Sequence, residues 1–157
     1  MAGKPLRCIS VGKLKTPFWK DAAAHYLMRI NRWRPLEYTE VRDGDAALPP
    51  DQRNALEGRR IIEALTPQDV VLVLDERGQG LTSPQMAALL QQMDQDARGR
   101  ACFIIGGAWG LDDCVRQKAC KMIRLSDMTL PHELARVVLL EQIYRAECIL
   151  RKVPYHH

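Results

Sequence analysis

Two continuous apolar runs near the middle of the chain constrain its fold more than any other feature. Residues 70–75 read VVLVLD and residues 101–106 read ACFIIG, and neither run alternates apolar with polar side chains. A strand with one face in water shows that alternation, whereas a continuous run of this length is typical of burial on both faces. We therefore predict two buried strands in a mainly parallel sheet with helices on both sides.

Weaker signals extend this plan along the rest of the chain. Two helix starts are predicted where a hydroxyl residue precedes a proline, at Thr16-Pro17 and at Ser83-Pro84. Turn-forming residues predict loops over 42–50, 76–82 and 127–131. We expect further strands over 5–11, 36–41 and 121–126, and helices over 17–33, 51–65, 83–97, 111–119 and 132–151. The order of elements predicts one α/β domain over residues 1–157, a mainly parallel sheet flanked by helices.

Composition argues against several other classes of protein. Hydrophobic residues make up 46% of the 157 residues and charged residues 27%, a balance typical of globular domains. No apolar run approaches the roughly 20 residues of a membrane span, and the first 15 residues lack a secretory signal. The five cysteines contain no C-x-x-C pair, so we expect free thiols instead of a metal site. We predict a cytoplasmic protein without a membrane partner.

Positive charge is concentrated in the first part of the chain. Residues 1–66 carry 12 Lys/Arg against 8 Asp/Glu, whereas residues 67–157 carry 11 of each. On charge alone a solvated helix surface is favoured, but a phosphate-facing patch is the alternative, and a dimer would double it. The residues concerned are Lys13, Lys15, Lys20, Arg29, Arg32 and Arg34.

A glycine-rich junction follows the second buried strand, where residues 102–113 read CFIIGGAWGLDD. A dinucleotide fingerprint, G-x-G-x-x-G counted from Gly106, fails because Ala108 and Leu111 occupy the second and third glycine positions. The glycines still allow a flat ligand to approach bare backbone, although a simple tight turn would look the same. The loop over 125–130, LSDMTL, follows the next strand and offers backbone groups between apolar side chains, which suits a purine. Ligands of parallel sheets lie beyond such carboxyl ends of strands.

Several of these segments together resemble a known family. The runs FIIGGAWGL, LSDMTLPHELARVVLLEQIYRA and the terminal PYHH, with ISVGKLK and LDERGQ earlier, are similar to small SPOUT-class methyltransferases. The specific resemblance is to the family that methylates N3 of a pseudouridine, the 1915 site, in bacterial 23S rRNA. It implies a SPOUT fold with a C-terminal deep trefoil knot, S-adenosylmethionine (SAM) as methyl donor and no metal. It also implies a homodimer acting on the assembled 70S ribosome.

The resemblance assigns roles to particular residues. Three are implied in catalysis: Arg136 beside the ring or a phosphate, and Tyr155 and His156 from the tail of a second subunit. The alternatives are a surface ion pair of Arg136 with Glu133, a packing role for Tyr155 and a mobile surface position for His156. The implied cofactor contacts are Leu74, Gly106, Leu125, Ser126, Asp127, Met128, Thr129 and Leu130. His132 is a weaker candidate, and the group that removes the N3 proton is not assigned.

Two positions depart from the family pattern. Trp109 stands in the glycine loop where a small or polar residue is expected, and His157 follows Tyr155-His156 where relatives carry a basic residue. Two other functions remain open at this point: a non-catalytic ribosome-binding maturation factor on the same fold, and a nucleotide-binding enzyme unrelated to RNA. Binding of SAM separates the methyltransferase from both.

Overall fold

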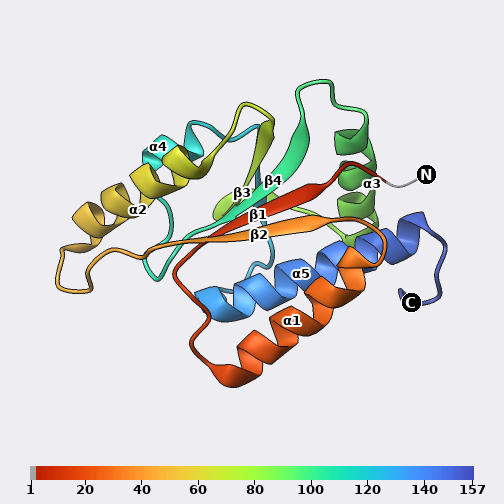
Figure 1. Cartoon of the computed structure of the whole chain (residues 1–157), viewed down its shortest axis with the longest axis horizontal. Helices are drawn as coiled ribbons and strands as arrows, with labels where there is room; N and C mark the ends of the chain where they lie inside the picture. The colour runs from red at the N-terminus through yellow and green to blue at the C-terminus, as the bar shows by residue number, and fades with distance from the viewer. Residues whose placement is uncertain (1–2) are drawn as a thin grey trace.

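A five-stranded parallel sheet forms the centre of the computed structural model, which describes residues 3–157 (Figure 1). The strands lie in the order β2-β1-β4-β3-β5. Both continuous apolar runs are interior strands, since β4 lies between β1 and β3, and β3 lies between β4 and β5. The strand bounds are β1 Leu6–Val11, β2 Leu36–Val41, β3 Asp69–Gly80, β4 Arg100–Ile105 and β5 Lys121–Arg124. The prediction of a parallel sheet is confirmed.

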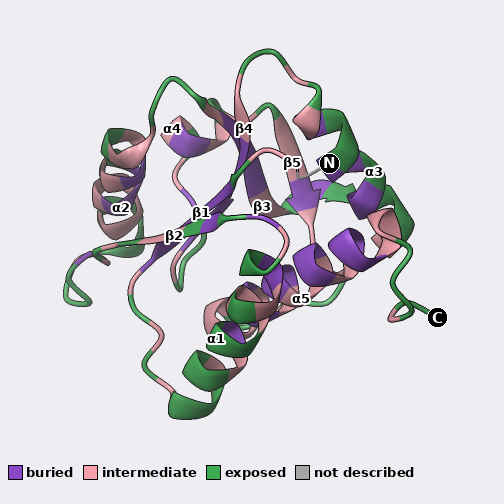
Figure 2. Ribbon diagram, turned by 45° about the vertical axis from the view of Figure 1, so that its right-hand side comes forward, coloured by how far each residue is buried: buried purple, intermediate pink, exposed green. Residues whose placement is uncertain are grey.

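Helices cover both faces of this sheet (Figures 1 and 2). Buried Leu6 and Cys8 of β1 belong to the core that includes α1, α3 and α5, whereas Ile9 and Val11 pack toward α2 and α4. This alternation follows from the two-residue period of a strand. Among residues 3–157, no helix combines the length and apolar character needed to cross a membrane. The helix bounds are α1 Pro17–Asn31, α2 Pro50–Ala64, α3 Ser83–Asp94, α4 Asp113–Arg116 and α5 His132–Leu150.

The strand β3 is longer than the sequence predicted. Residues 76–82 were expected to form a loop, but β3 continues to Gly80. Its pairing with β5 jumps from Leu74 to Gln79, both opposite Ile123, so the intervening residues bulge out. A Cβ atom on Gly78 would lie 2.5 Å from the backbone nitrogen of Ile123, so β5 passes too close for a side chain there. The prediction was wrong because this extension depends on backbone pairing and not on apolar side chains.

Helix ends also differ from the prediction. The cap of α3 is Thr82 and not Ser83: its hydroxyl accepts from the Gln85 backbone N–H, and the Gln85 side chain accepts from the Thr82 N–H. This reciprocal capping box satisfies two N–H groups that the helix itself leaves unpaired. Thr16 occupies the cap position of α1, but its hydroxyl donates to Glu133 of α5. The helix α4 is only four residues long, shorter than the predicted 111–119.

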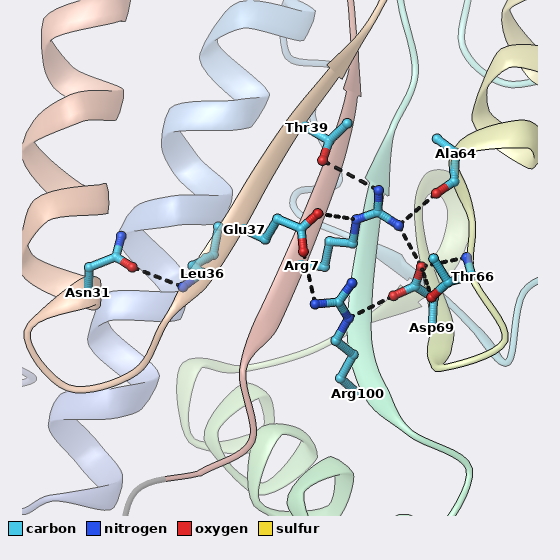
Figure 3. Close-up of polar contacts among 9 residues, drawn as sticks. All are labelled: Arg7, Asn31, Leu36, Glu37, Thr39, Ala64, Thr66, Asp69 and Arg100. Carbon is cyan, nitrogen blue, oxygen red and sulfur yellow. Dashed lines mark hydrogen bonds and ion pairs between the residues drawn. The ribbon is translucent and has the colours of Figure 1, made fainter.

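An ion-pair network joins the amino ends of the strands (Figure 3). The guanidinium groups of Arg7 and Arg100 lie 2.6 and 2.9 Å from the enclosed Asp69 carboxylate, and both also contact Glu37. Burial raises the pKa of Asp69, but hydrogen bonds from Thr66, Arg100 and Arg7 outweigh it and lower the pKa below its usual value. The network thus ties β1, β2, β3 and β4 together at the edge opposite their carboxyl ends.

Candidate functional site

The carboxyl edge of the sheet brings the three predicted cofactor segments together. In the adjacent strands β3 and β4, Val73 pairs with Ile104, so Leu74 and Gly106 follow at the same level. Leu74 also pairs with Ile123 of β5, and the loop over 125–130 begins two residues later. Segments that are far apart in the sequence therefore meet at the ends of three neighbouring strands, as predicted for a ligand site in a parallel sheet.

The glycine loop is closed on itself. A Cβ atom on buried Gly106 would lie 2.5 Å from the carbonyl oxygen of Gly110, and Gly107 forms an isolated bridge with Gly110. Gly110 has φ of +83°, which glycine adopts without strain. The Asn54 side chain donates to the Trp109 carbonyl at 2.9 Å, while the Trp109 side chain is 60% exposed. Gly106 is thus required by the turn itself, whatever ligand approaches it.

The loop over 125–130 keeps its backbone groups available. Within residues 3–157, the backbone of 126–130 makes no hydrogen bond to another backbone group. Side chains hold its shape: Ser126 accepts from the Met128 N–H, and Arg124 donates to Asp127 at 2.7 Å. Leu125 is partly buried and Met128 is 80% exposed. Apart from the Met128 N–H, the backbone donors and acceptors of this described loop are available between apolar side chains and fit the purine of the implied SAM.

A pocket of about 320 Å³ lies on the other side of the glycine loop. It opens between the carboxyl end of β1, the start of α5 and the segments before α1 and α2. A larger hollow of about 570 Å³ lies at the opposite edge, beside Asp69 and Arg98. Since ligands of parallel sheets lie beyond the carboxyl ends of strands, we assign the smaller pocket to the site. Its lining includes Gly12, Lys13, Lys15, Arg53, Gly107 and His132.

Arg136 lies behind this pocket instead of facing a substrate. Its side chain is fully buried, with the guanidinium donating to Glu40 at 3.1 Å, to the Tyr38 hydroxyl at 3.4 Å and to the Val11 carbonyl. This burial corrects the prediction that Arg136 contacts the substrate ring or a phosphate. The alternative, an ion pair between Arg136 and Glu133, is not formed among residues 3–157 either. Arg136 instead fixes the end of β1 against α5.

The predicted catalytic tail folds back and packs along the second half of α5. The Tyr155 hydroxyl donates to Glu141 at 3.1 Å, its ring contacts Tyr144, and His156 Nδ1 lies 3.3 Å from Arg145. Burial raises the pKa of Tyr155 to about 12, so the hydroxyl keeps its proton. Glu141 and Arg145 lie about 14 and 20 Å along α5 from His132, which separates the tail from the pocket of its own chain.

The predicted phosphate patch divides into two groups. The prediction that Arg34 faces a phosphate is corrected. Its side chain is 2% exposed and lies 2.8 Å from Asp94 and 2.9 Å from Glu147, so it does not face solvent. Arg29 lies over the Tyr144 ring at 4.9 Å. The remaining four side chains are exposed, and two of them line the pocket. These four are Lys13, Lys15, Lys20 and Arg32.

Sequence reasoning missed the contribution of α2 to the pocket. Arg53 lines it, with Nε 3.1 Å from the Glu57 carboxylate and Nη2 3.7 Å from Asp43. Glu57 is only 2% exposed and also accepts from the Gly44 N–H. The sequence held one signal of the Arg53–Glu57 pair, since an acid four residues after an arginine lies beside it on the same face of a helix. Among residues 3–157, no group of three or more His, Cys, Asp or Glu side chains is placed to hold a metal ion.

The fold defines an α/β protein whose strand-end loops gather at the carboxyl edge of its parallel sheet. The sequence profile described as "Predicted SPOUT methyltransferase" matches residues 5–156, and the chain belongs to this SPOUT methyltransferase family. Among its relatives, Ribosomal RNA large subunit methyltransferase H of Desulfovibrio desulfuricans is 86% identical over 157 residues, which is 100% of both chains. The protein of the same name from Lawsonia intracellularis is 48% identical, again over 100% of both chains.

Solved structures agree with the fold. A probable methyltransferase from Bordetella pertussis Tohama I superposes with a TM-score of 0.60 at 16% identity, covering 91% of this chain and 94% of that one. A probable rRNA-methyltransferase from Porphyromonas gingivalis gives a TM-score of 0.58 at 12% identity, covering 95% and 71%. These likenesses confirm the predicted fold class, while the threading of a trefoil knot stays a prediction.

Proposed function

We propose that the chain is a SAM-dependent methyltransferase that methylates N3 of a pseudouridine in 23S rRNA of the assembled bacterial ribosome. The observation that carries the proposal is the full-length similarity to relatives named for large-subunit rRNA methylation, at 86% and 48% identity. A ribosomal substrate places the protein in the cytoplasm. SAM supplies an already activated methyl group, so the protein has to align N3 with it and assist loss of the N3 proton.

The cofactor would be held by the three strand-end segments. Leu74 and Leu125 supply apolar contact, Gly106 and the backbone of residues 126–130 supply close approach and hydrogen bonds, and Met128 covers the exposed side. The phosphates of the RNA would meet the exposed Lys13, Lys15, Lys20 and Arg32. Attraction of this kind falls with salt, since each phosphate contact releases a counterion.

We further propose that the protein acts as a homodimer. Tyr155 and His156 contact Glu141 and Arg145, which lie about 14 and 20 Å along α5 from His132 in the pocket of the same chain, so we infer that they complete a site on a second copy. The tail is already shaped for this: Arg145 stacks over the Tyr155 ring at 4.6 Å and fixes its orientation. The Tyr155 ring would then be presented to the partner's substrate, while its hydroxyl stays bonded to Glu141.

Methyl transfer to ribosomes tests the proposal directly. Tritium-labelled SAM is incubated with the protein and 70S ribosomes from a bacterial strain that lacks its own enzyme for this modification. Isolated subunits and free 23S rRNA are treated in parallel. We expect label in the ribosomes, and mass spectrometry of the digested RNA should place the methyl group on N3 of one pseudouridine.

Calorimetry with SAM separates the possible failures. SAM binding without any transfer to ribosomes would favour a ribosome-binding factor that has lost catalysis. No SAM binding at millimolar concentration would exclude the methyltransferase reaction for this chain. Transfer to free RNA but not to ribosomes would overturn the assembled ribosome as substrate.

A further inference from the structure

The glycine loop lies between the predicted cofactor site and the observed pocket. On one side, Gly106 closes the predicted cofactor site between β4 and β3, and on the other, Gly107 lines the 320 Å³ pocket beside β1. The cofactor loop over 125–130 runs directly into Pro131 and His132, and His132 lines the same pocket. A methyl acceptor in this pocket would therefore share two walls with the methyl donor. The volume is sufficient for one pyrimidine nucleotide.

The charge of the pocket suits an anionic ligand. Glu133 is occupied, because its carboxylate accepts from the Lys15 and Thr16 N–H groups and from the Thr16 hydroxyl. In the part of the chain that the structure describes, the Lys13 and Lys15 side chains form no ion pair. With Arg53, these lysines outnumber the acidic lining residues Asp43 and Glu133, so the pocket lining carries a net positive charge that matches the phosphate of a nucleotide.

His132 faces this pocket from the first turn of α5. The pKa of His132 is lowered, first because burial disfavours the charged imidazole and then because Arg136 and Arg53 lie nearby, while Glu133 and Glu57 act in the opposite direction. The helix N-terminus also disfavours a positive charge there. The imidazole is consequently neutral at neutral pH, the form that can accept a proton.

We propose that this pocket takes the target uracil-type nucleotide, and that His132 of the same chain accepts the N3 proton during methyl transfer. This inference rests on the proposed function. The N3–H bond breaks, its electron pair forms the N3–CH₃ bond, and the proton passes to a ring nitrogen of His132. The pair of the old C–S bond stays on sulfur, which turns from sulfonium to thioether. The resulting imidazolium returns its proton to water.

With His132 as the proton acceptor, His156 has a role other than that of the base. His156 is exposed at the far end of α5, and its ring nitrogen contacts the Arg145 guanidinium. His132, by contrast, is set in the cavity wall by its backbone position at the start of a long helix. His156 would therefore position or cover the nucleotide from the partner chain.

The test compares three histidine-to-glutamine variants on ribosomes. His132→Gln should lower kcat by about 10²-fold or more, in the range of a general base, while SAM affinity by calorimetry stays within about twofold. His25→Gln removes an exposed histidine of α1 and should leave kcat unchanged. The wild-type pH profile should fall at pH below the usual histidine pKa of 6.5, and this acid limb should be absent from the residual activity of His132→Gln. Persistence of the limb in that variant and its loss in His156→Gln would overturn the assignment.

A second measurement does not depend on catalysis. The imidazole nitrogens of ¹⁵N-histidine-labelled wild-type protein are followed by NMR as uridine 5′-monophosphate is added. We expect His132 to titrate below the usual histidine pKa of 6.5 and its resonances to shift on nucleotide addition, whereas the His25 resonances should not respond to the nucleotide. Absence of a shift at millimolar nucleotide would overturn the pocket assignment. If the wild-type protein transfers no methyl group, the proposed function is wrong. If a folded His132→Gln variant keeps full activity, only the assignment of His132 as the proton acceptor is wrong.

Discussion

Arg34→Gln tests whether a sequence-predicted phosphate contact is in fact a structural ion pair. In the structure, both Nη atoms of Arg34 contact the Asp94 carboxylate at 2.8 and 2.9 Å, and Nε lies 2.9 Å from Glu147. The side chains of Arg34 and Glu147 are 2% and 1% exposed, so neither charge is solvated by water. The substitution leaves Glu147 with Arg151, 3.3 Å away, as its remaining cation.

The size of the effect follows from this geometry. Removing one partner of a buried ion pair costs about 3–5 kcal/mol, because the other charge stays buried. Asp94 is 24% exposed and Glu147 keeps Arg151, so we take about 3 kcal/mol, at the lower end. At about 2–4 °C per kcal/mol for a chain of this size, the expected fall in Tm is about 6–12 °C.

Thermal unfolding at fixed protein concentration measures this loss, with Lys20→Gln as the matched control. Lys20 is an exposed member of the same predicted patch, so its loss should change stability by no more than about 0.5 kcal/mol. The salt dependence of ribosome binding gives the second readout. Arg34→Gln should keep the wild-type slope, whereas Lys15→Gln should reduce it by about one phosphate contact. A Tm within about 2 °C of wild type, or a reduced salt slope for Arg34→Gln, would refute the reasoning.

Four further predictions concern the site itself. Gly106→Ala places a methyl group 2.5 Å from a carbonyl oxygen of its own loop, so SAM affinity by calorimetry should fall at least about tenfold. Unchanged affinity would show that the loop can open without cost. Deletion of residues 155–157 should abolish methyl transfer while SAM still binds, and retained transfer would contradict a partner-supplied tail. Trp109→Ala should weaken ribosome binding about tenfold through lost stacking, whereas Trp109→Phe should not, and Tm should stay unchanged in both because the side chain is 60% exposed. The pKa of Glu133 is lowered, first by the Lys15 N–H, so its stabilising effect is present above the usual pKa of 4.5 and is lost as pH falls through the lowered value. Acid unfolding of Glu133→Gln should accordingly lack this part of the pH dependence.

The sheet could be predicted because strands that are buried on both faces consist of apolar residues. The runs over 70–75 and 101–106 are apolar throughout, and they became interior strands. The continuation of β3 to Gly80 could not be predicted in this way, since ERGQG is polar and pairs through its backbone. The sequence could not show why residue 78 must be glycine, because the strand that leaves no room for a side chain there lies more than 40 residues later in the chain.

The site was predictable to the extent that it depends on backbone. Gly106 and the loop over 125–130 follow strands, and the ends of parallel strands share one edge of a sheet. Charged side chains gave no comparable guidance. Arg34 and Lys15 look alike in a sequence, yet one is buried between two carboxylates and the other faces solvent, because tertiary partners far along the chain decide this. Arg136 was misplaced for the same reason.

The helix α5 supports the proposal that two copies of this chain form the site. Its first turn presents His132 to the pocket, whereas Glu141 and Arg145, about 14 and 20 Å further along the helix, hold Tyr155 and His156. Arg136 does not take the place of the tail in the pocket, since it is turned inward to Glu40 and Val11. Two chains related by a two-fold axis would exchange tails and complete both pockets at once. Loss of dimerisation should therefore remove methyl transfer while each chain keeps its own SAM site.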